Sequence, residues 1–265
     1  MIAPMLIALA LLVAAAAPAL AAPPRPGEPL FTEAQLAPFF NGFDASFRLV
    51  DPTQGRGAVL DGRGAAVPVS PWSTFKILNA LIALETGVAT GPDFAIPWDR
   101  QPRERPEWNQ EQTLRSAVEH SAVWYFQELA RRIGPRQMQK YVSAAHYGNS
   151  DISGGIDRFW LGSSLRISLD EQLEFLIRLQ RGQQLPFRPR SLDVVKDILR
   201  LRLTEKGTLR GKTGSDGKSL AWFVGWVEHE GRPVFFATQL RGHDGASGAK
   251  AREITERILV KAGLL

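Results

Sequence analysis

Cysteine is absent from this chain of 265 residues. Without cysteine there can be no disulfide framework, no thiolate nucleophile and no cysteine-ligated zinc site. Histidine is scarce: the sequence has four, His120, His146, His229 and His243, and none stands in an H-x-H or H-E-x-x-H spacing. A metallohydrolase would need ligands gathered from distant parts of the chain. We therefore expect no metal in the functional site.

Other signatures are missing as well. No G-x-S-x-G elbow occurs, so a Ser-His-Asp hydrolase is unsupported, although triad members need not be adjacent in sequence. The net charge is +5 and the isoelectric point is near 9.7, which suits anionic partners. The basic residues are spread along the chain, without a lysine-arginine block or an aromatic-basic RNA signature. The charge would suit nucleic acid, an anionic surface or anionic small substrates, but we favour the ordinary interpretation, a basic soluble protein, and expect no nucleic-acid partner.

Long apolar runs are limited to one, residues 2–22. It ends in Ala19-Leu20-Ala21, a small-x-small cleavage signal, so residues 1–21 are predicted to be a signal peptide cleaved after about Ala21. An uncleaved anchor is the alternative, because no lysine or arginine precedes the run. With no second run and no cysteine for lipidation, residues 22–265 are expected to be exported to the periplasm without stable membrane association.

The rest of the composition predicts a folded α+β protein. At 44% hydrophobic and 22% charged residues, the chain can bury a full core as one large domain or two closely packed ones. Alternating patterns predict strands at both chain ends, and apolar residues at three and four spacing predict helices between them. The expected strands are 45–50, 57–60, 208–213, 219–228 and 233–240, and the expected helices are 33–37, 73–84, 112–119, 124–133, 135–145, 169–181, 191–200 and 249–261.

This order predicts one antiparallel sheet built from both chain ends, with a helical region inserted between its parts. The functional site is expected in the cleft between the sheet and the helical region.

The motif Ser73-Thr74-Phe75-Lys76 carries most of the chemical information. Residues three apart on a helix share a face, and the apolar run after Lys76 predicts a buried helix. Burial disfavours an ammonium group, so the amine of Lys76 is expected to be neutral near pH 7 and able to accept a proton from Ser73. Ser73 at the helix start would meet free N–H groups that favour developing negative charge.

The same spacing occurs twice more. Ser215 and Lys218 lie in a polar, glycine-bearing stretch that predicts a turn. Ser247 and Lys250 open a helix with a charged polar face, where a lysine stays hydrated. Only Ser73 precedes a core helix, so we interpret Ser73 as the nucleophile.

Three further motifs have both an ordinary and a functional interpretation. Lys212-Thr213-Gly214 at the end of an expected strand places a cation, a hydroxyl and a position without a side chain on a sheet edge, but it also fits a lysine beside a turn glycine. Ser121-Ala122-Val123 fits a helix cap. Tyr147-Gly148-Asn149 fits a loop with a turn glycine.

Together these motifs resemble the penicillin-recognising serine enzymes. With Phe159-Trp160-Leu161 they follow the order and spacing of class D, oxacillinase-type serine beta-lactamases, and the similarity covers nearly all of residues 22–265. No E-x-x-L-N segment appears, which argues against the class A relatives. The resemblance implies the beta-lactamase and transpeptidase fold, and hydrolysis of the lactam amide of penicillin-type antibiotics through a serine acyl-enzyme.

The resemblance also implies residue roles. Ser73 would be the nucleophile and Lys76 its base, carboxylated on its nitrogen (N6-carboxylysine) by carbon dioxide or bicarbonate, with no other cofactor. The remaining catalytic residues would be Ser121, Trp160 and Lys212; the substrate-binding residues Thr213, Gly214, Ser215, Arg252, Val123 and Leu161; and the structural residues near the site Tyr147 and Asn149. Arg241 and Lys250 compete with Arg252 for the substrate carboxylate, and backbone N–H groups of Ser73 and Ser215 would form the oxyanion hole.

Three alternatives stay open. A penicillin-sensing domain resembles this family, acylates on the same serine and deacylates slowly, but such domains normally lie beside membrane helices. A peptidoglycan transpeptidase or carboxypeptidase would use the same serine and lysine on D-Ala-D-Ala. A non-enzymatic domain would leave the ordered motifs to coincidence. The partners expected are beta-lactams, and the protein itself is expected to be a monomer or a homodimer.

Overall fold

The computed structural model describes residues 27–61, 64–242 and 245–265. Within them, no helix is both long and apolar enough to cross a bilayer. The signal peptide predicted for residues 1–21 lies outside the described residues, so the cleavage after about Ala21 and the periplasmic location stay predictions.

The N-terminal part of the fold supplies two strands. The short helix α1, Glu33–Leu36, starts at a capping box in which Thr32 and Gln35 bind each other's backbone. The 3-10 helix η1, Ala37–Phe40, follows it. Strands β1, Asp44–Asp51, and β2, Arg56–Asp61, then pair antiparallel. Both strands lie where the alternating pattern predicts them.

A mostly helical region separates these strands from the rest of the sheet. Its elements are η2 (Trp72–Phe75), α2 (Lys76–Glu85), β3 (Ala95–Ile96), η3 (Pro106–Trp108), β4 (Gln112–Thr113), α3 (Leu114–Glu119), α4 (Val123–Ala144), α5 (Leu169–Arg181) and α6 (Pro189–Ile198). Local signals set several boundaries: Ser168 and Glu171 form a capping box at the start of α5, and Gly182 ends it at φ 66°.

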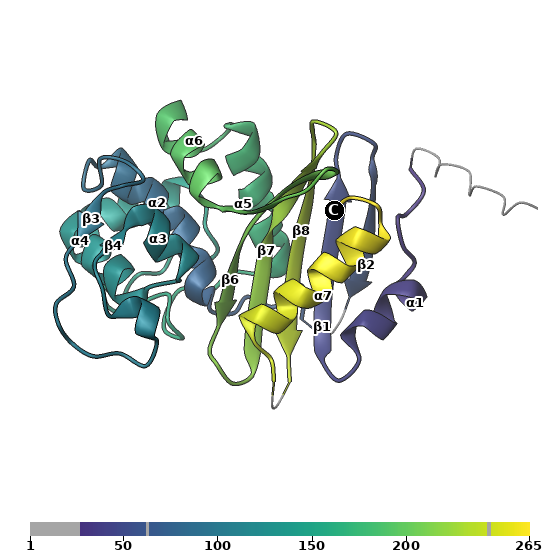
Figure 1. Cartoon of the computed structure of the whole chain (residues 1–265), viewed down its shortest axis with the longest axis horizontal. Coiled ribbons are helices and arrows are strands. Elements are labelled where there is room, and N and C mark those ends of the chain that lie inside the picture. Colours follow the sequence, from purple (N-terminus) through teal and green to yellow (C-terminus); the bar gives the residue numbers. More distant parts are fainter. Residues whose placement is uncertain (1–26, 62–63, 243–244) are drawn as a thin grey trace, which may run out of the picture.

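The chain then returns to the sheet. Strands β5 (Arg200–Leu203), β6 (Gly207–Ser215), β7 (Leu220–His229) and β8 (Arg232–Arg241) precede the closing helix α7 (Gly248–Lys261). The six strands lie in the order β2-β1-β8-β7-β6-β5, and each neighbouring pair is antiparallel. Because β1 pairs with β8, one sheet is built from both chain ends, and the α+β fold expected from the sequence is confirmed (Figure 1).

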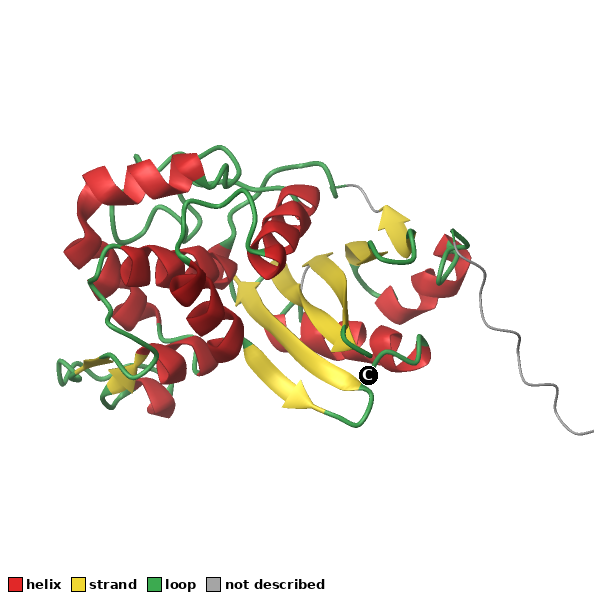
Figure 2. Cartoon of the chain, turned by 90° about the horizontal axis from the view of Figure 1, so that it is seen from above, coloured by secondary structure: helices red, strands yellow, loops and turns green. Residues whose placement is uncertain are grey.

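The sheet separates two apolar cores. On one face, Phe47, Phe223 and Phe236 pack with residues of α7 such as Ile254 and Ile258. On the other face, strand residues including Trp222, Val224 and Phe235 join the core of the helical region. Helices therefore cover both faces of the sheet, while α2, α3 and α4 lie beyond its β5–β6 side (Figures 1 and 2).

The helices expected at 124–133 and 135–145 are confirmed as the two halves of α4, which are separated by a non-helical Gly134 at φ 76° and ψ 159° before Pro135. Two other details differ from the sequence-based expectation. Residues 112–113 belong to the short strand β4, so α3 is shorter than expected. Arg200 begins β5 rather than ending α6, because its segment is hydrogen-bonded to β6.

Candidate active site

The nucleophile motif lies at the junction of two helical turns. Trp72–Phe75 forms η2, and Lys76 is the first residue of α2, so Ser73 sits in a 3-10 turn one step before the expected α-helix. Ser73 is half-buried. Trp72 adopts a positive φ of 51°, which is uncommon for a bulky residue, and its N–H donates to the Trp160 carbonyl at 3.1 Å. The chain is thus held in a strained turn that places Ser73 beside Lys76.

Lys76 is completely buried, with 0% of its surface exposed. Its Nζ donates to Ser73 Oγ at 2.5 Å. Burial lowers the pKa of the Lys76 ammonium well below its usual value of 10.5, and the positive charges of Lys212 and Arg105 lower it further. The neutral amine expected from the sequence is therefore favoured by both the burial and the charges around it.

Trp160 packs against Phe75 of the nucleophile motif. Its ring stacks on Phe75 with centroids 5.2 Å apart and planes 27° from parallel. Its carbonyl accepts hydrogen bonds from Trp72 N–H and from Ser70 Oγ, the latter at 2.8 Å. Its indole Nε1, by contrast, is buried and has no hydrogen-bond partner. Because buried donors are almost always paired, this N–H marks a place where an acceptor is missing.

The Ser121-Ala122-Val123 motif forms the turn between α3 and α4 rather than a side-chain cap. Ala122 occupies the cap position of α4 with no capping side chain, so the predicted Ser121 cap is wrong. Ser121 instead adopts φ 56° and is half-buried. The first turns of α4 pack against α2, since the ring of Phe126 lies 5.6 Å from Lys76 Nζ and the Phe126 carbonyl accepts a hydrogen bond from Asn79.

Strand β6 brings the Lys212-Thr213-Gly214 motif to the nucleophile. Lys212 is 5% exposed, and its Nζ donates to the Thr213 carbonyl at 3.3 Å. Burial, aided by the charges of Arg105 and Arg252, lowers the pKa of Lys212 to about 7. A Cβ added to Gly214 would lie 2.9 Å from the Pro71 carbonyl oxygen and 3.2 Å from Ser73 N, so only glycine permits this approach.

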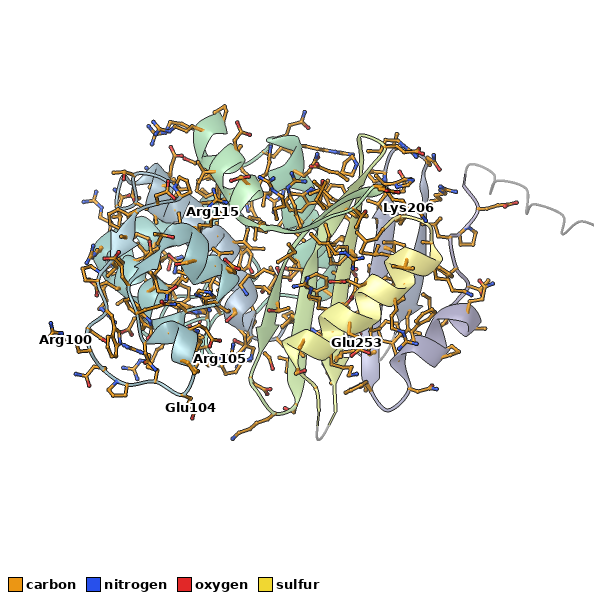
Figure 3. The ribbon with its side chains drawn as sticks, in the orientation of Figure 1. Arg100, Glu104, Arg105, Arg115, Lys206 and Glu253 are labelled. Carbon is orange, nitrogen blue, oxygen red and sulfur yellow. The ribbon has the colours of Figure 1, made fainter. Side chains whose placement is uncertain are left out.

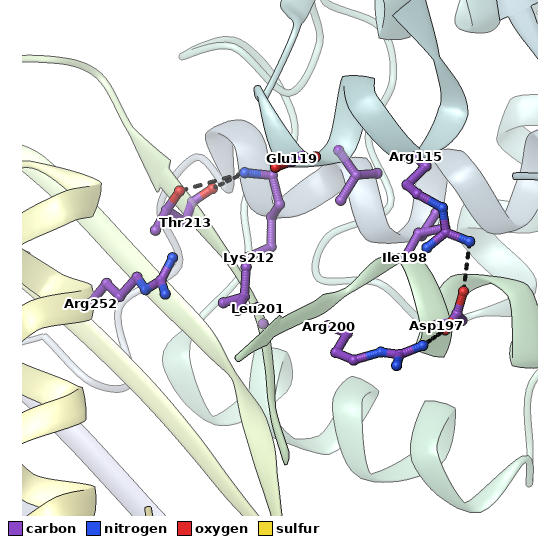
Figure 4. A pocket seen from close by; sticks show the side chains of 11 residues that line it. Arg115, Glu119, Asp197, Ile198, Arg200, Leu201, Lys212, Thr213 and Arg252 are labelled. Atoms are coloured by element: carbon purple, nitrogen blue, oxygen red, sulfur yellow. Dashed lines mark hydrogen bonds and ion pairs between the residues drawn. The ribbon is translucent and has the colours of Figure 1, made fainter. Parts of the chain in front are cut away.

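Arg252 is distinguished from its two competitors by position. It lies on α7, lines the same cavity as Lys212 and Thr213, and points toward Thr213 (Figure 4). Its Nε donates to Glu256 at 2.6 Å. Arg241 instead donates to the Gly64 carbonyl at 3.0 Å, and Lys250 pairs with Glu253 at 2.6 Å. Of the three cations, the structure brings Arg252 to the strand edge.

The two remaining copies of the S-x-x-K spacing are ordinary structure. Ser215 ends β6 and accepts a hydrogen bond from Gly217 N–H in the following turn. Ser247 caps α7, and Lys250 on that helix is 41% exposed at its side chain. Both agree with the turn and the surface helix predicted from the sequence.

Tyr147 and Asn149 support the site from behind. The Tyr147 ring packs edge-on against Phe75 at 5.8 Å, and its hydroxyl donates to Gln172 Oε1 at 3.2 Å. Asn149 joins two loops, since its side chain accepts from Arg166 N–H and donates to the Ser164 carbonyl. These contacts fix the segment that follows Trp160. Val123 and Leu161 are both half-buried, at the start of α4 and directly after Trp160 respectively.

Two residues near the site escaped the sequence analysis. Gln172 is fully buried on α5 and donates to Thr74 Oγ1 at 2.6 Å, which ties α5 to the nucleophile turn. A polar residue on the apolar face of an amphipathic helix was the available signal. Arg105, labelled in Figure 3, lies in the loop before Trp108 with its guanidinium 5.2 Å from that ring. No pattern in the sequence singles it out.

Among residues 27–61, 64–242 and 245–265, no group of three histidine, aspartate or glutamate side chains is placed to hold a metal. The chemistry available to the cluster is therefore that of a hydroxyl, two amines with lowered pKa values, an unpaired indole N–H and a guanidinium.

Comparisons with known proteins agree with this geometry. The model of the penicillin binding protein transpeptidase domain matches residues 48–260. The probable beta-lactamase YbxI of Bacillus subtilis (strain 168) is 41% identical over 231 residues, which cover 85% of this chain and 84% of that protein. The crystal structure of a class D beta-lactamase from Bacillus subtilis superposes with a TM-score of 0.83 at 39% identity, over 87% of this chain and 96% of that one.

The chain belongs to the class D beta-lactamase family. A regulatory protein is also among the relatives. The regulatory protein BlaR1 of Bacillus licheniformis is 37% identical over 232 residues, which are 85% of this class D chain but only 38% of BlaR1. The class D chain described here thus corresponds to one part of that longer protein.

Proposed function

We propose that this class D protein hydrolyses the lactam amide of penicillin-type antibiotics through an acyl-enzyme on Ser73. The observation that carries the proposal is the contact of 2.5 Å between the fully buried Lys76 amine and Ser73 Oγ. A lysine with a lowered pKa can take the hydroxyl proton as the oxygen attacks the carbonyl carbon. The lactam C–N bond then breaks and leaves an ester on Ser73.

The residues around Lys76 fit a carboxylated lysine. Carbon dioxide reacts with a neutral amine, which the burial of Lys76 supplies, and the Trp160 indole N–H is a buried donor without an acceptor. A carbamate on Lys76 would supply a carboxylate base for the Ser73 proton and for the hydrolytic water. Trp160 would hold that carboxylate by donating from Nε1, while Val123 and Leu161 keep water away from it.

The strand edge supplies the remaining roles. The backbone N–H groups of Ser73 and Ser215 are proposed to stabilise the oxyanion, each donor contributing about 3 to 4 kcal/mol to the transition state. Thr213 and Arg252 bind the substrate carboxylate, supported by their shared cavity. Ser121 passes a proton to the lactam nitrogen, and Lys212 holds Ser121 in place. The approach of Gly214 to Ser73 N keeps these groups together.

The test is the hydrolysis of a chromogenic cephalosporin by residues 22–265, with and without added bicarbonate, alongside Lys76→Ala. We expect many turnovers per protein molecule, raised by bicarbonate and lost in the variant. Activity should also fall as the pH is lowered, because protonation of Lys76 removes both the base and the nucleophile for carbon dioxide.

A sensor is the second candidate, favoured by the identity to BlaR1. It would give one stoichiometric burst of product and a stable acyl-enzyme detectable by mass spectrometry. A burst would also fit a transpeptidase, and a D-Ala-D-Ala peptide as substrate would separate the two. Either result would replace the hydrolase proposal.

A further inference from the structure

The carboxylate end of the site opens into a cavity, and the roles above use only the end of that cavity at Thr213 and Arg252. It has a volume of about 330 Å³ and lies between β6, α3, the end of α6 and the start of β5 (Figure 4). The described residues that line it include Lys212, Thr213 and Arg252 but neither Ser73 nor Lys76. The cavity therefore continues the β6 edge on the far side of the proposed carboxylate site from the nucleophile.

Strand pairing explains why the cavity exists. Strand β5 pairs with β6 from Thr208 as far as Arg210. The next backbone hydrogen bond along β6 is donated by Gly211 N–H to the Leu199 carbonyl at 3.0 Å. From Lys212 onward β5 no longer covers the strand. The wall opposite β6 is then formed by side chains of α3, the end of α6 and the start of β5, and its apolar residues are Val118, Ile198 and Leu201.

The far end of the cavity carries a net positive charge. Arg115 donates to Asp197 at 2.7 Å, and Arg200 pairs with the same carboxylate. The two guanidiniums lower the pKa of Asp197, so it stays ionised, but one carboxylate neutralises only one of them. The other acidic residue on the lining is Glu119, which is exposed, while Glu256 pairs with Arg252 at the near end.

This arrangement matches a ligand with acidic, apolar and acidic parts in that order. A lactam held with its carbonyl at Ser73 and its ring carboxylate at Thr213 and Arg252 would direct the substituent on the carboxylate-bearing ring away from Ser73. A flat heterocycle there would meet Val118, Ile198 and Leu201. An acidic group on that heterocycle would reach the uncompensated charge of Arg115 and Arg200.

We propose that this cavity is a subsite for an acidic substituent on the carboxylate-bearing ring of the substrate, an inference that rests on the proposed function. The arginines at its far end determine specificity and do not take part in the chemistry. Their effect is expected on the rate at which the intact lactam acylates Ser73.

Two cephalosporins test the proposal: they share one acylamino group and carry a tetrazolylthiomethyl group with either a methyl or a sulfomethyl substituent. The measured quantity is the ratio of kcat/KM for the sulfomethyl over the methyl compound. Arg115→Gln leaves Asp197 paired with Arg200 and should lower the ratio about fivefold, the effect of losing one partly exposed charge contact. Asp197→Asn should raise the ratio, because it removes the carboxylate that neutralises one of the two arginines. The methyl compound should change less than twofold in Arg115→Gln.

Arg131→Gln is the matched control, because Arg131 is an ion-paired helical arginine, 48% exposed, on α4 and outside the cavity lining. It removes the same charge and should leave the ratio unchanged. Equal losses for both cephalosporins, or equal ratios in Arg115→Gln and Arg131→Gln, would overturn the subsite. If the protein acylates without turnover, the same ratio is measured on the acylation rate, so failure of the hydrolase proposal and failure of the subsite remain distinguishable.

Discussion

At the scale of single residues, the site contains two buried nitrogen groups that lack the partners such groups normally have in a protein interior. Lys76 is buried without a carboxylate partner among the described residues, and Trp160 Nε1 is buried without an acceptor. A buried unsatisfied donor costs about 1 to 3 kcal/mol of stability, and a buried ammonium costs more. A single carbamate on Lys76 would satisfy both groups at once, which makes their coincidence informative.

Trp160→Phe tests this link. The substitution keeps an aromatic ring against Phe75 but removes the Nε1 N–H. We expect bicarbonate-stimulated hydrolysis to fall by about 10- to 100-fold, since a hydrogen bond to a charged group contributes about 1.5 to 3 kcal/mol. In bicarbonate-free buffer, the free energy of unfolding should fall by less than the about 1.5 to 3 kcal/mol expected for a lost hydrogen bond to a charged group, because Trp160 Nε1 has no hydrogen-bond partner without the carbamate. Urea titrations and initial rates give both quantities. Unchanged bicarbonate stimulation in the variant would remove Trp160 from the proposed mechanism.

At the scale of elements, the site is a contact between a strand edge and a helical turn. Gly214 on β6 lies so close to η2 that a Cβ would meet the Pro71 carbonyl oxygen at 2.9 Å. The nearest atoms are backbone atoms of Pro71 and Ser73 and the Cγ2 atom of the buried Thr74, so no long flexible side chain is there to move away. The distance between the two proposed oxyanion donors, Ser73 N and Ser215 N, therefore depends on this one position.

Gly214→Ala should push β6 away from η2 and lower kcat/KM at least tenfold. Crowding of this kind typically lowers stability by about 1 to 3 kcal/mol. Gly211→Ala is the control on the same strand, because its Cβ would crowd the Val224 carbonyl at 2.7 Å rather than the nucleophile turn. Similar unfolding midpoints with a much larger rate loss at Gly214 are expected. Equal rate losses would show that strand distortion in general, and not this contact, limits activity.

The bend in α4 depends on the backbone conformation of Gly134. Gly134, at φ 76° and ψ 159°, occupies a region that is essentially restricted to glycine, while no atom lies within 4 Å of a Cβ built there. Gly134→Ala should therefore lower the free energy of unfolding by about 1 to 3 kcal/mol through the backbone alone. Gly91, which also has open space around its Cβ position but no positive φ, provides the comparison. Gly91→Ala should change stability by no more than about 1 kcal/mol, as chemical denaturation would show.

At the scale of the whole molecule, the fold tolerates a cluster of like charges between its two parts. Besides burial, the charges of Lys212 and Arg105 lower the pKa of Lys76, and the charges of Arg105 and Arg252 lower the pKa of Lys212. Lys212 comes from the sheet and Lys76 from the helical region. The apolar cores on both faces of the sheet hold these two parts together against that repulsion. The same arrangement that lowers the lysine pKa values thus reduces global stability.

Lys212→Met should reveal this cost through pH. The folded-state pKa of Lys212 is about 7 and its ordinary value is 10.5, so the unfolded chain binds more protons between those values and the stability of the native protein rises with pH there. At about pH 7 the variant should be the more stable protein, and its advantage should shrink as the pH approaches 10. The raised pKa values of Tyr125 and Tyr147 are common to both proteins and cancel in the difference. A difference in unfolding midpoint independent of pH would contradict the lowered pKa.

Local patterns in the sequence were sufficient to place most of the long elements and the ordered motifs. Apolar patterns between turn signals located β1, β2, β6, β7 and β8, and apolar residues at three and four spacing located α5 at 169–181. The spacing of Ser73 and Lys76 placed both on one helical face before a buried helix. These properties are local, so they can be recognised without knowing what packs against them.

Which distant groups meet could be learned only from how the elements pack. That Arg252 rather than Arg241 or Lys250 reaches Thr213, that Arg105 influences Lys76 and Lys212, and that Gln172 binds Thr74 all follow from the docking of α5, α7 and the Trp108 loop. The unpaired Trp160 Nε1 and the cavity beside Lys212 also result from the packing of segments that are distant in sequence. The physical reason is that burial and electrostatic coupling depend on all surrounding atoms, most of which are far away in sequence.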